Sequence, residues 1–363
     1  MAGQVTGIRY TPEAASTASL VADFASDVKS KPSPAMLRAL VDAEVGDEQA
    51  GEDPTTNELC GRVADLLGKE AAVLLPTGTM CNEIALVLHC EPGSEVICAG
   101  SAHIINFEAG GPGALGGIMI HAIDGPFGLF TAADVRAAVR PPSRYAPESR
   151  LVAVEQTSNL GGGAVWPLEQ LRAVAAEAKS HGLKTHMDGA RLFNACISSG
   201  VAPRDHAAGY DTVWIDLTKG LGGFAGAVLA GSAADIDKAW RLKQRWGGGL
   251  RQSGHIAATG LYALDHNVER LAEDHALAAS IGERIADMPN VSRVLPVETN
   301  IVIFDLAEDG PTADEVVDAL LEKGVRVGAF GERRVRVVTH LGVDRAGADM
   351  LCARLPAALA GQA

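Results

Sequence analysis

The chain has 363 residues, of which 47% are hydrophobic and 21% are charged. This composition is typical of a soluble globular enzyme and excludes a disordered chain. The formal net charge of −14 argues against nucleic acid or an anionic membrane as a partner, so a small anion has to be bound by a local cationic pocket. No run of about 18 apolar residues is present, which excludes a transmembrane helix.

The N-terminal segment and the cysteines bear on the cellular compartment. Residues 1–22 are rich in Ala, Ser and Thr and lack the apolar core and basic start of a secretory signal, so we expect an N-terminal arm. The six cysteines include no C-x-x-C pair, and no metal-ligand spacing is present. These features predict reduced thiols, a cytoplasmic protein and no metal site.

Two helices come first in chain order, one opened by Ser33 and Pro34 and one ended by Gly68. Strand and helix patterns then alternate. The expected strands are residues 71–75, 95–98, 118–123, 151–155, 184–187, 213–217 and 226–230, and the expected helices are residues 79–89, 131–139, 168–179 and 233–246. This alternation predicts an α/β fold with a mostly parallel sheet covered on both faces, which binds ligands outside the carboxyl ends of its strands.

The pattern changes near residue 267, where shorter strands mix with helices. The expected strands there are residues 291–296, 301–304, 325–327 and 335–338, with helices at residues 313–323 and at the end of the chain. A chain of this length exceeds the usual size of a single core. The sequence therefore predicts a large domain of residues 23–266 and a small α+β domain of residues 267–363.

Lys219 is the first candidate for chemistry. It follows the apolar strand 213–217 and precedes a glycine-rich turn, so its backbone is fixed and its amine can face a concave site. A lysine in that position can form a Schiff base with an aldehyde. The alternative is a solvated lysine at a strand end.

Two further strand ends carry candidate ligands. Gly78 and Thr79 follow strand 71–75 and open a helix, whose free N–H groups suit a phosphate. Asp188 ends strand 184–187, where a carboxylate can keep a pyridine nitrogen protonated. The alternatives are an ordinary strand-to-helix turn and a helix N-cap.

Other candidates are weaker when taken alone. Residues 111–116 match G-x-G-x-x-G by letter, but a dinucleotide site needs a helix there, and we expect the strand 118–123 to follow directly. His103 can lie flat over a planar cofactor, or be an ordinary histidine. Arg251 and Arg336 can bind anions through two parallel hydrogen bonds, or be solvated.

Together these pieces resemble the threonine aldolase group of the fold-type-I pyridoxal-phosphate enzymes, also described as β-eliminating lyases. The resemblance runs from about residue 23 to the end of the chain. It rests on Ser26-Asp27, Gly51-Glu-Asp-Pro-Thr55, Leu75-Pro-Thr-Gly-Thr79, His103 with Phe107-Glu-Ala-Gly-Gly111, Asp188-Gly-Ala-Arg191, Thr218-Lys-Gly-Leu-Gly222, Gly247-Gly-Gly-Leu-Arg-Gln252 and Val335-Arg-Val-Val-Thr-His340. It implies a large domain with a seven-stranded, mostly parallel sheet and a smaller α+β domain.

The resemblance also implies residue roles. Lys219, Asp188 and His103 are implied to be catalytic: Lys219 carries pyridoxal 5'-phosphate, Asp188 pairs with its pyridine nitrogen and His103 stacks on its ring. The resemblance further implies that the cofactor or the substrate is contacted by seven other residues, namely Gly78, Thr79, Arg191, Arg251, Ser26, Arg336 and Ser158. Gly78 and Thr79 hold the phosphate, with Arg251 reaching it from a neighbouring subunit of a homotetramer. Ser26, Arg191 and Arg336 hold the substrate carboxylate.

Two departures from the family pattern concern the substrate. Ser158 stands where these enzymes commonly have the histidine of a Thr-His-Asn stretch, and Ala50 stands where a tyrosine is common. Serine cannot act as a base near neutral pH as imidazole can. We expect an aldolase that cleaves threonine, allo-threonine or a bulkier analogue such as phenylserine to glycine and an aldehyde. The alternatives are a β-eliminating lyase or transferase on another amino acid, and a non-catalytic cofactor-binding protein.

Overall fold

The computed structural model describes residues 20–361. They form two compact units, one of residues 32–269 and one that combines residues 20–31 with residues 270–361. Residues 1–19 of the predicted N-terminal arm lie outside the described residues. No described helix is long and apolar enough to cross a membrane.

The unit of residues 32–269 is built on a seven-stranded sheet. In spatial order its strands are β2 (Ala71–Leu75), β8 (Ala227–Gly231), β7 (Thr212–Asp216), β6 (Lys184–Gly189), β5 (Ser149–Glu155), β3 (Glu95–Ala99) and β4 (Met119–Ile123). The five strands from β7 to β4 run parallel, and β8 is antiparallel to both of its neighbours. The predicted α/β fold and its mostly parallel sheet are confirmed.

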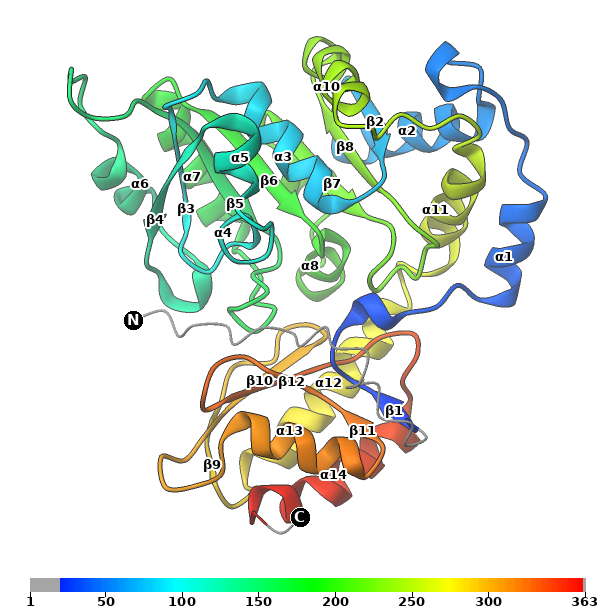
Figure 1. Cartoon of the computed structure of the whole chain (residues 1–363), viewed down its shortest axis with the longest axis vertical. Coiled ribbons are helices and arrows are strands. Elements are labelled where there is room, and N and C mark those ends of the chain that lie inside the picture. Colours follow the sequence, from blue (N-terminus) through cyan, green and yellow to red (C-terminus); the bar gives the residue numbers. More distant parts are fainter. Residues whose placement is uncertain (1–19, 362–363) are drawn as a thin grey trace. The chain divides into compact units, whose positions relative to one another are not determined.

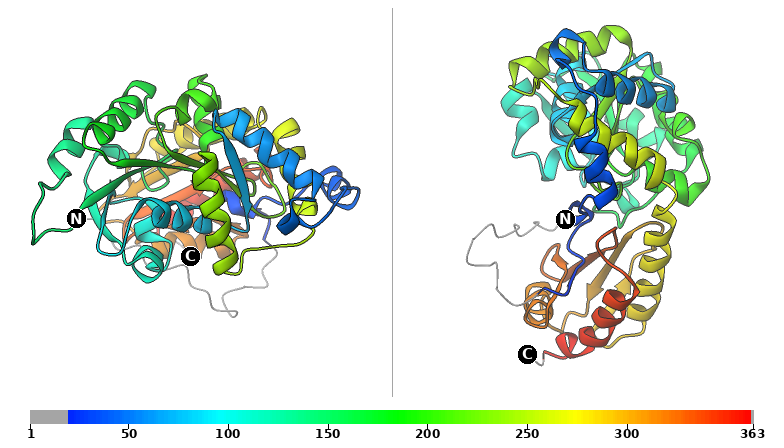
Figure 2. Two further views of the ribbon diagram at one scale, coloured as in Figure 1. Left: turned by 90° about the horizontal axis from the view of Figure 1, so that it is seen from above. Right: turned by 90° about the vertical axis from the view of Figure 1, so that its right-hand side faces the viewer.

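Helices cover both faces of this sheet (Figures 1 and 2). They are α1 (Pro34–Val41), α2 (Pro54–Leu67), α3 (Gly78–His89), α4 (His103–Asn106), α5 (Gly111–Gly116), α6 (Ala132–Ala138), α7 (Leu168–Ser180), α8 (Leu192–Ser199), α9 (Pro203–Ala207), α10 (Ala233–Arg245) and α11 (Gly254–His266), with short 3₁₀ turns η3 (Glu48–Ala50) and η4 (Pro126–Gly128). Helices α3 and α10 pack together on one face, and α2, α7 and α9 pack on the other.

Side-chain caps fix where the helices begin. Ser33, Asp53 and Thr77 each accept a hydrogen bond from the backbone N–H three residues further on, at distances of 2.9 to 3.1 Å. Helix α3 therefore begins at Gly78, one residue before the predicted start, because Thr77 is its cap. Helix α2 ends at Gly68, whose φ of 64° lies in the left-handed region that glycine tolerates.

One prediction for this unit is wrong. The sequence predicts no helix at residues 111–116, and the structure has α5 there. A dinucleotide-binding fingerprint also requires a strand directly before its glycines. The element before α5 is the short helix α4, so the letters of the motif occur in a different structural context.

The second unit is an α+β sandwich. Its four-stranded sheet has the order β12 (Gly328–Ala329), β13 (Arg334–Val338), β10 (Ile301–Leu306) and β9 (Val291–Val294), with all neighbours antiparallel. Helices α12 (Leu271–Ala286), α13 (Ala313–Glu322) and α14 (Arg345–Leu359) bury their apolar faces in its core. The turn η2 (Asp27–Lys29) also belongs to this unit.

The structure corrects the predicted domain limits at the N-terminal side. The sequence places residues 23–31 in the large domain, whereas the structure places residues 20–31 in the second unit. Strand β1 (Ala22–Asp23) pairs in parallel with β11 (Val325–Arg326), and Phe24 is fully buried in the core of that unit. A two-residue strand that pairs across about 300 residues of chain leaves no periodic signal in the sequence.

A buried ion pair joins α10 to the η3 turn in the unit of residues 32–269. Lys243 Nζ lies 2.7 Å from Glu48 Oε1, and both side chains are inaccessible to solvent. The same carboxylate oxygen accepts the backbone N–H of Leu250 at 2.6 Å.

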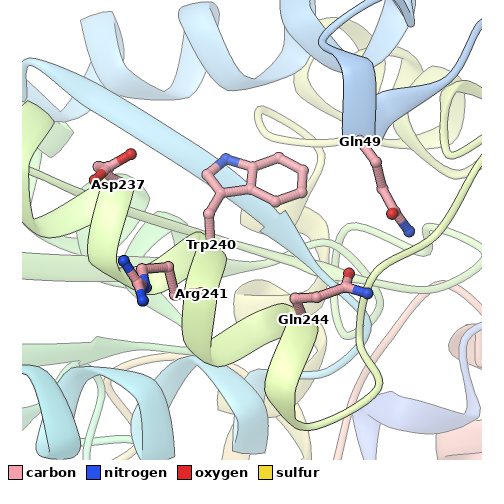
Figure 3. Close-up of a pocket in the computed structure, with 5 residues that line it drawn as sticks. All are labelled: Gln49, Asp237, Trp240, Arg241 and Gln244. Carbon is pink, nitrogen blue, oxygen red and sulfur yellow. The ribbon is translucent and has the colours of Figure 1, made fainter.

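A surface hollow beside α10 is lined by Gln49, Asp237, Trp240, Arg241 and Gln244 (Figure 3). None of the site residues predicted from the sequence lines this hollow.

We expect Lys243→Met to destabilise the unit by about 3 to 5 kcal/mol, because it leaves the Glu48 charge buried without its partner. The double replacement Lys243→Met with Glu48→Gln should regain most of that loss, since no uncompensated charge remains. Thermal unfolding of the three variants and the wild type measures both effects. A double variant as unstable as the single one would contradict a pair that interacts through charge.

Candidate active site

Lys219 lies three residues beyond the end of β7, in a turn that depends on its glycines. The N–H of Gly223 donates to the carbonyl of Leu217 at 2.7 Å, and a side chain at Gly223 would overlap that carbonyl. The Lys219 amine donates to Asp216 Oδ2 at 2.6 Å and lies 5.6 Å from the centre of the Trp214 ring. Its side chain is only 15% exposed. The structure thus places this lysine just beyond a strand end, in a glycine-rich turn, with its amine mostly buried.

Asp188 ends the neighbouring strand β6 and is almost fully buried. Its carboxylate accepts the side-chain N–H of Asn82 at 2.9 Å and the backbone N–H of Ala190 at 3.0 Å. Within residues 20–361, no cationic side chain lies at ion-pair distance from it. Because a buried carboxylate is costly without compensation, the site favours a cation on the ligand at this point.

The parallel register brings these two strand ends beside a third. Asp188 is paired with Trp214 on β7 and with Glu155 on β5. Glu155 accepts the backbone N–H of His103 at 2.7 Å, and burial together with the charge of Asp188 raises the pKa of Glu155 to about 7. The sequence identifies candidate site residues at the ends of β6 and β7. The strand register places Glu155 beside them, although no sequence motif identifies this residue.

His103 opens α4 and is held by a hydrogen-bonded network. Its Nδ1 lies 2.7 Å from Glu108 Oε1, and the same oxygen accepts the Asn82 side-chain N–H at 2.6 Å. Ligand atoms of His103, Glu108 and Asp188 lie within 4.8 Å of one another. These groups have donor types that metals bind, but Asn82 donates to both carboxylates and so turns them toward a hydrogen-bond donor. His103 and Asp188, both predicted site residues, are therefore linked through Glu108 and Asn82.

The protonation of His103 follows from this network. Burial alone lowers the pKa of an imidazole, because it disfavours the charged form. The hydrogen bond to Glu108 outweighs it, helped by the carboxylates of Asp188 and Glu155, and the pKa of His103 is raised. The ring is thereby held with Nδ1 as a donor to Glu108 whenever it is charged.

Gly78 and Thr79 form the N-terminus of α3, as predicted. Their N–H groups have no acceptor within the helix, whereas Thr77 Oγ1 already caps the N–H of Met80. A side chain at Gly78 would overlap the indole of Trp214, so only glycine lets α3 approach β7 this closely. The indole N–H donates to Asn82 Oδ1 at 2.7 Å. Trp214 thus contacts both the helix N-terminus and Lys219.

Two further predicted residues lie in this unit. Arg191 is buried at the N-cap of α8, with its backbone N–H donating to Gln156 at 3.1 Å. Ser158 is buried beyond the end of β5, and a side chain at Gly128 would overlap the hydroxyls of Ser158 and Ser101. Ser158 therefore occupies a crowded corner of the unit.

Arg251 is not brought to the residues around Lys219 within this chain. Its guanidinium pairs with Asp47 Oδ2 at 2.8 Å, and its side chain is 61% exposed. The backbone of Arg251 accepts the N–H of Glu48 at 2.9 Å, which anchors its loop to the η3 turn. Exposure at a fixed loop is compatible with a role toward another subunit.

Ser26 and Arg336 belong to the second unit, where they lie close together. Arg336 is 6% exposed on β13, donates to the carbonyl of Ala25 at 3.0 Å and stacks 4.0 Å from the centre of the Phe330 ring. Ser26 follows Ala25 and accepts the N–H of Val28 at 3.4 Å. Pairing of β1 with β11 brings this N-terminal segment to the strand that carries Arg336.

A mostly parallel α/β sheet with a lysine, an acid and an anion-binding helix N-terminus at its strand ends defines the fold-type-I class of pyridoxal-phosphate enzymes. Comparison with known proteins narrows this class. The family model of the β-eliminating lyases matches residues 23–309, and the chain belongs to this family, within its threonine aldolase group.

Three similar proteins illustrate the relationship. A probable low-specificity L-threonine aldolase 2 of Arabidopsis thaliana is 39% identical over 324 residues, 88% of this chain and 91% of the relative. The low specificity L-threonine aldolase of Escherichia coli K12 is also 39% identical, over 89% of this chain and 95% of the relative. A solved threonine aldolase of Leishmania major superposes with a TM-score of 0.79 at 21% identity, over 92% of this chain and 98% of that one, which supports the fold.

The residues present fit pyridoxal phosphate, the cofactor of this group. Asp188 is a buried carboxylate with only neutral donors, so a protonated pyridine nitrogen would complete its charge balance. The free N–H groups of Gly78 and Thr79 suit the phosphate, and Lys219 provides the amine that binds an aldehyde. Asn82, Glu108, Glu155, Asp216 and Trp214 support these groups and were not identified from the sequence.

We expect Gly78→Ala to weaken cofactor binding and lower the thermal midpoint, because its methyl group forces α3 and Trp214 apart, at a cost of about 1 to 3 kcal/mol. The matched control is Gly61→Ala on the exposed face of α2, where a methyl group meets nothing within 4 Å. That control should raise stability by roughly 0.8 kcal/mol. Absorbance of retained cofactor after dialysis, together with thermal melts, tests both expectations.

Proposed function

We propose that the protein is a pyridoxal-phosphate-dependent aldolase that cleaves a β-hydroxy-α-amino acid to glycine and an aldehyde. The observation that carries this proposal is the convergence of Lys219, Asp188 and the N-terminus of α3 on the ends of β6 and β7. The relatives named low-specificity L-threonine aldolase share this chain over about nine tenths of its length. Threonine, allo-threonine and phenylserine are the substrates to test first.

The cofactor, when bound, supplies the electron sink that accepts the electron pair of the breaking Cα–Cβ bond. Asp188 keeps the ring nitrogen protonated, because a buried anion without a cationic partner stabilises a positive charge beside it. Lys219 would hold the cofactor through its amine, whose place the amine of the substrate would take. Asp216, at 2.6 Å, keeps the released amine close to the reacting atoms.

Substrate orientation is assigned to Ser26, Arg191 and Arg336. A guanidinium that donates two parallel hydrogen bonds to a carboxylate fixes its plane as well as its position. In this chemistry the orientation of the bound substrate would decide which bond to Cα is weakened. The stacking of Arg336 on Phe330 supports this role, since it holds the guanidinium plane in place.

Ser158 cannot remove the proton of the β-hydroxyl, because a serine hydroxyl does not ionise near neutral pH. It can hold that hydroxyl by a hydrogen bond. The same departure favours a second candidate function, β-elimination, in which a substituent leaves Cβ and no hydroxyl proton is removed. An eliminase would release a keto acid and ammonia in place of glycine and an aldehyde.

For the assembly we propose a homotetramer in which Arg251 reaches the phosphate bound by another subunit. The exposure of Arg251 on an anchored loop supports this proposal. We further propose a cytoplasmic location. All six cysteines are free thiols, which suits a reducing compartment.

A product screen with β-hydroxy-α-amino acids tests the main proposal. Wild-type protein should release glycine and an aldehyde, and Lys219→Ala should lose this activity by a factor on the order of 10³ or more, because no other amine can hold the cofactor. Ser158→His should raise turnover of threonine by restoring an imidazole. Release of keto acid and ammonia by the wild type would favour the eliminase, and absence of any product would contradict both functions.

Arg336→Lys should lower kcat/KM by about 10- to 150-fold, because one of two hydrogen bonds to a charged carboxylate is lost. Arg334→Lys on the same strand is the matched control, since Arg334 pairs with Asp305 at 2.6 Å. That control should leave kcat/KM nearly unchanged. Steady-state kinetics of both variants with the best substrate provide the measurement, and equal losses would remove the assigned role of Arg336.

A further inference from the structure

Glu83 is a buried acid that the proposed reaction does not use. It lies in the second turn of α3, one residue after Asn82, and is 2% exposed. Both of its carboxyl oxygens are buried and lack a hydrogen-bond donor among the residues that the structure describes. Gly111 leaves room for it, because a side chain there would overlap the Glu83 carboxyl group. An ionised carboxylate in such a position would be strongly disfavoured.

The neighbour of Glu83 is Glu108, the residue that holds His103. One Glu108 oxygen, Oε1, accepts hydrogen bonds from His103 and Asn82, at 2.7 and 2.6 Å. The other, Oε2, is buried and has no donor among the described residues. Glu108 lies beside Glu83, because Asn82, the residue before Glu83, donates to Glu108 Oε1. Gly111, which borders the Glu83 carboxyl group, also donates its N–H to the Glu108 carbonyl at 2.8 Å. Three carboxyl oxygens without a donor therefore meet at one place.

One shared proton resolves this arrangement. If Glu83 is protonated, its O–H donates to Glu108 Oε2, and the pair carries a single negative charge. Two ionised carboxylates in contact away from water would repel each other. Burial, then the charge and the hydrogen bond of Glu108, raise the pKa of Glu83 to about 8. At neutral pH the proton therefore resides mainly on Glu83.

The other charged groups near this pair cannot replace that proton. His103 is bonded to Glu108 through its Nδ1, and Asp188 and Glu155 are further acids that face His103. Lys219 is paired with Asp216. The network around His103 thus holds four buried carboxyl groups, those of Glu83, Glu108, Asp188 and Glu155. Among these five groups of the described residues, the ring of His103 is the one that can become cationic.

We propose that Glu83 is a positioning residue. Its carboxyl O–H donates a hydrogen bond to Glu108 and thereby holds Glu108 as the fixed acceptor for His103. The hydrogen bonds thus run from Glu83 to Glu108 and connect Glu108 to His103. The proposal rests on the proposed function in one respect, namely that His103 lies against the cofactor ring. A Glu108 side chain held at both oxygens cannot rotate, so the imidazole plane is fixed as well.

The decisive variant is Glu83→Gln, which keeps the size and a donor toward Glu108 but cannot titrate. Glu83→Leu removes the donor. The matched control is Glu91→Gln, an exposed acid just beyond the end of α3. Infrared spectra of the holoenzymes in H₂O and D₂O, over a range of pH, report protonated carboxyl groups without any need for turnover. Subtracting the Glu83→Gln spectrum from that of the wild type cancels the contribution of Glu155, which both proteins share.

We expect the wild-type minus Glu83→Gln spectrum to show a protonated carboxyl band at neutral pH that disappears as the pH rises through about 8. The wild type minus Glu91→Gln should show no such band. If the band is absent from the first difference spectrum at neutral pH, the proposal is overturned, even when aldolase activity is normal. If the band is present but no aldehyde forms with any substrate, the proposed function fails and the protonated pair stands.

Kinetics then separate positioning from a purely structural role. Glu83→Gln should retain most of the wild-type kcat at neutral pH, and its kcat should exceed that of the wild type above about pH 8, where the wild-type pair gains a second charge. Glu83→Leu should lower kcat by about 10-fold with little change in KM, because Glu108 loses one hydrogen bond to its charged group. Identical pH profiles of kcat for the wild type and Glu83→Gln would overturn the assignment.

Discussion

The Asp188 carboxylate is almost fully buried, and the residues around it are arranged so that its oxygens still have hydrogen-bond donors. Its donors, Asn82 and the backbone of Ala190, are neutral. Asn82 is itself fixed through its oxygen, which lies 2.7 Å from the indole nitrogen of Trp214 and 3.1 Å from His186 Nε2. Burial lowers the pKa of His186 to about 3, so it stays neutral. In the proposed function, the cation that Asp188 lacks in this chain is the ring nitrogen of the cofactor.

In the proposed function, helix α3 connects the contacts to the two ends of the cofactor. Its N-terminus, with Gly78 and Thr79, would offer N–H groups to the phosphate, and Asn82, one turn later, donates to Asp188, the acid proposed for the ring nitrogen. A single rigid helix therefore sets the distance between these two contacts. Its approach to β7 depends on the absence of a side chain at Gly78, because the indole of Trp214 fills that space. The packing of α3 against Trp214 therefore also sets the geometry of the site.

The site is rich in acids, as is the whole chain with its net charge of −14. Protons offset part of this charge, since the pKa of Glu83 is raised to about 8 and that of Glu155 to about 7. His103 offsets another part through its hydrogen bond to Glu108. Ser158 adds no charge to this balance, whereas an imidazole in its place could. The substitution that departs from the family pattern thus also affects the electrostatics of the site.

The sequence by itself determined the α/β class, the seven strands and the residues at the strand ends, because periodicity and glycine-rich turns are local signals. Lys219, Asp188 and Gly78 were predicted from such signals together with the family resemblance. Only the tertiary structure decided which elements lie side by side. The pairing of β1 with β11 places Ser26 near Arg336, and the register of β5, β6 and β7 places Glu155 beside Asp188. The meeting of Glu83 with Glu108, far apart in any periodic pattern, likewise depends on the packing of α3 and has no local signal in the sequence.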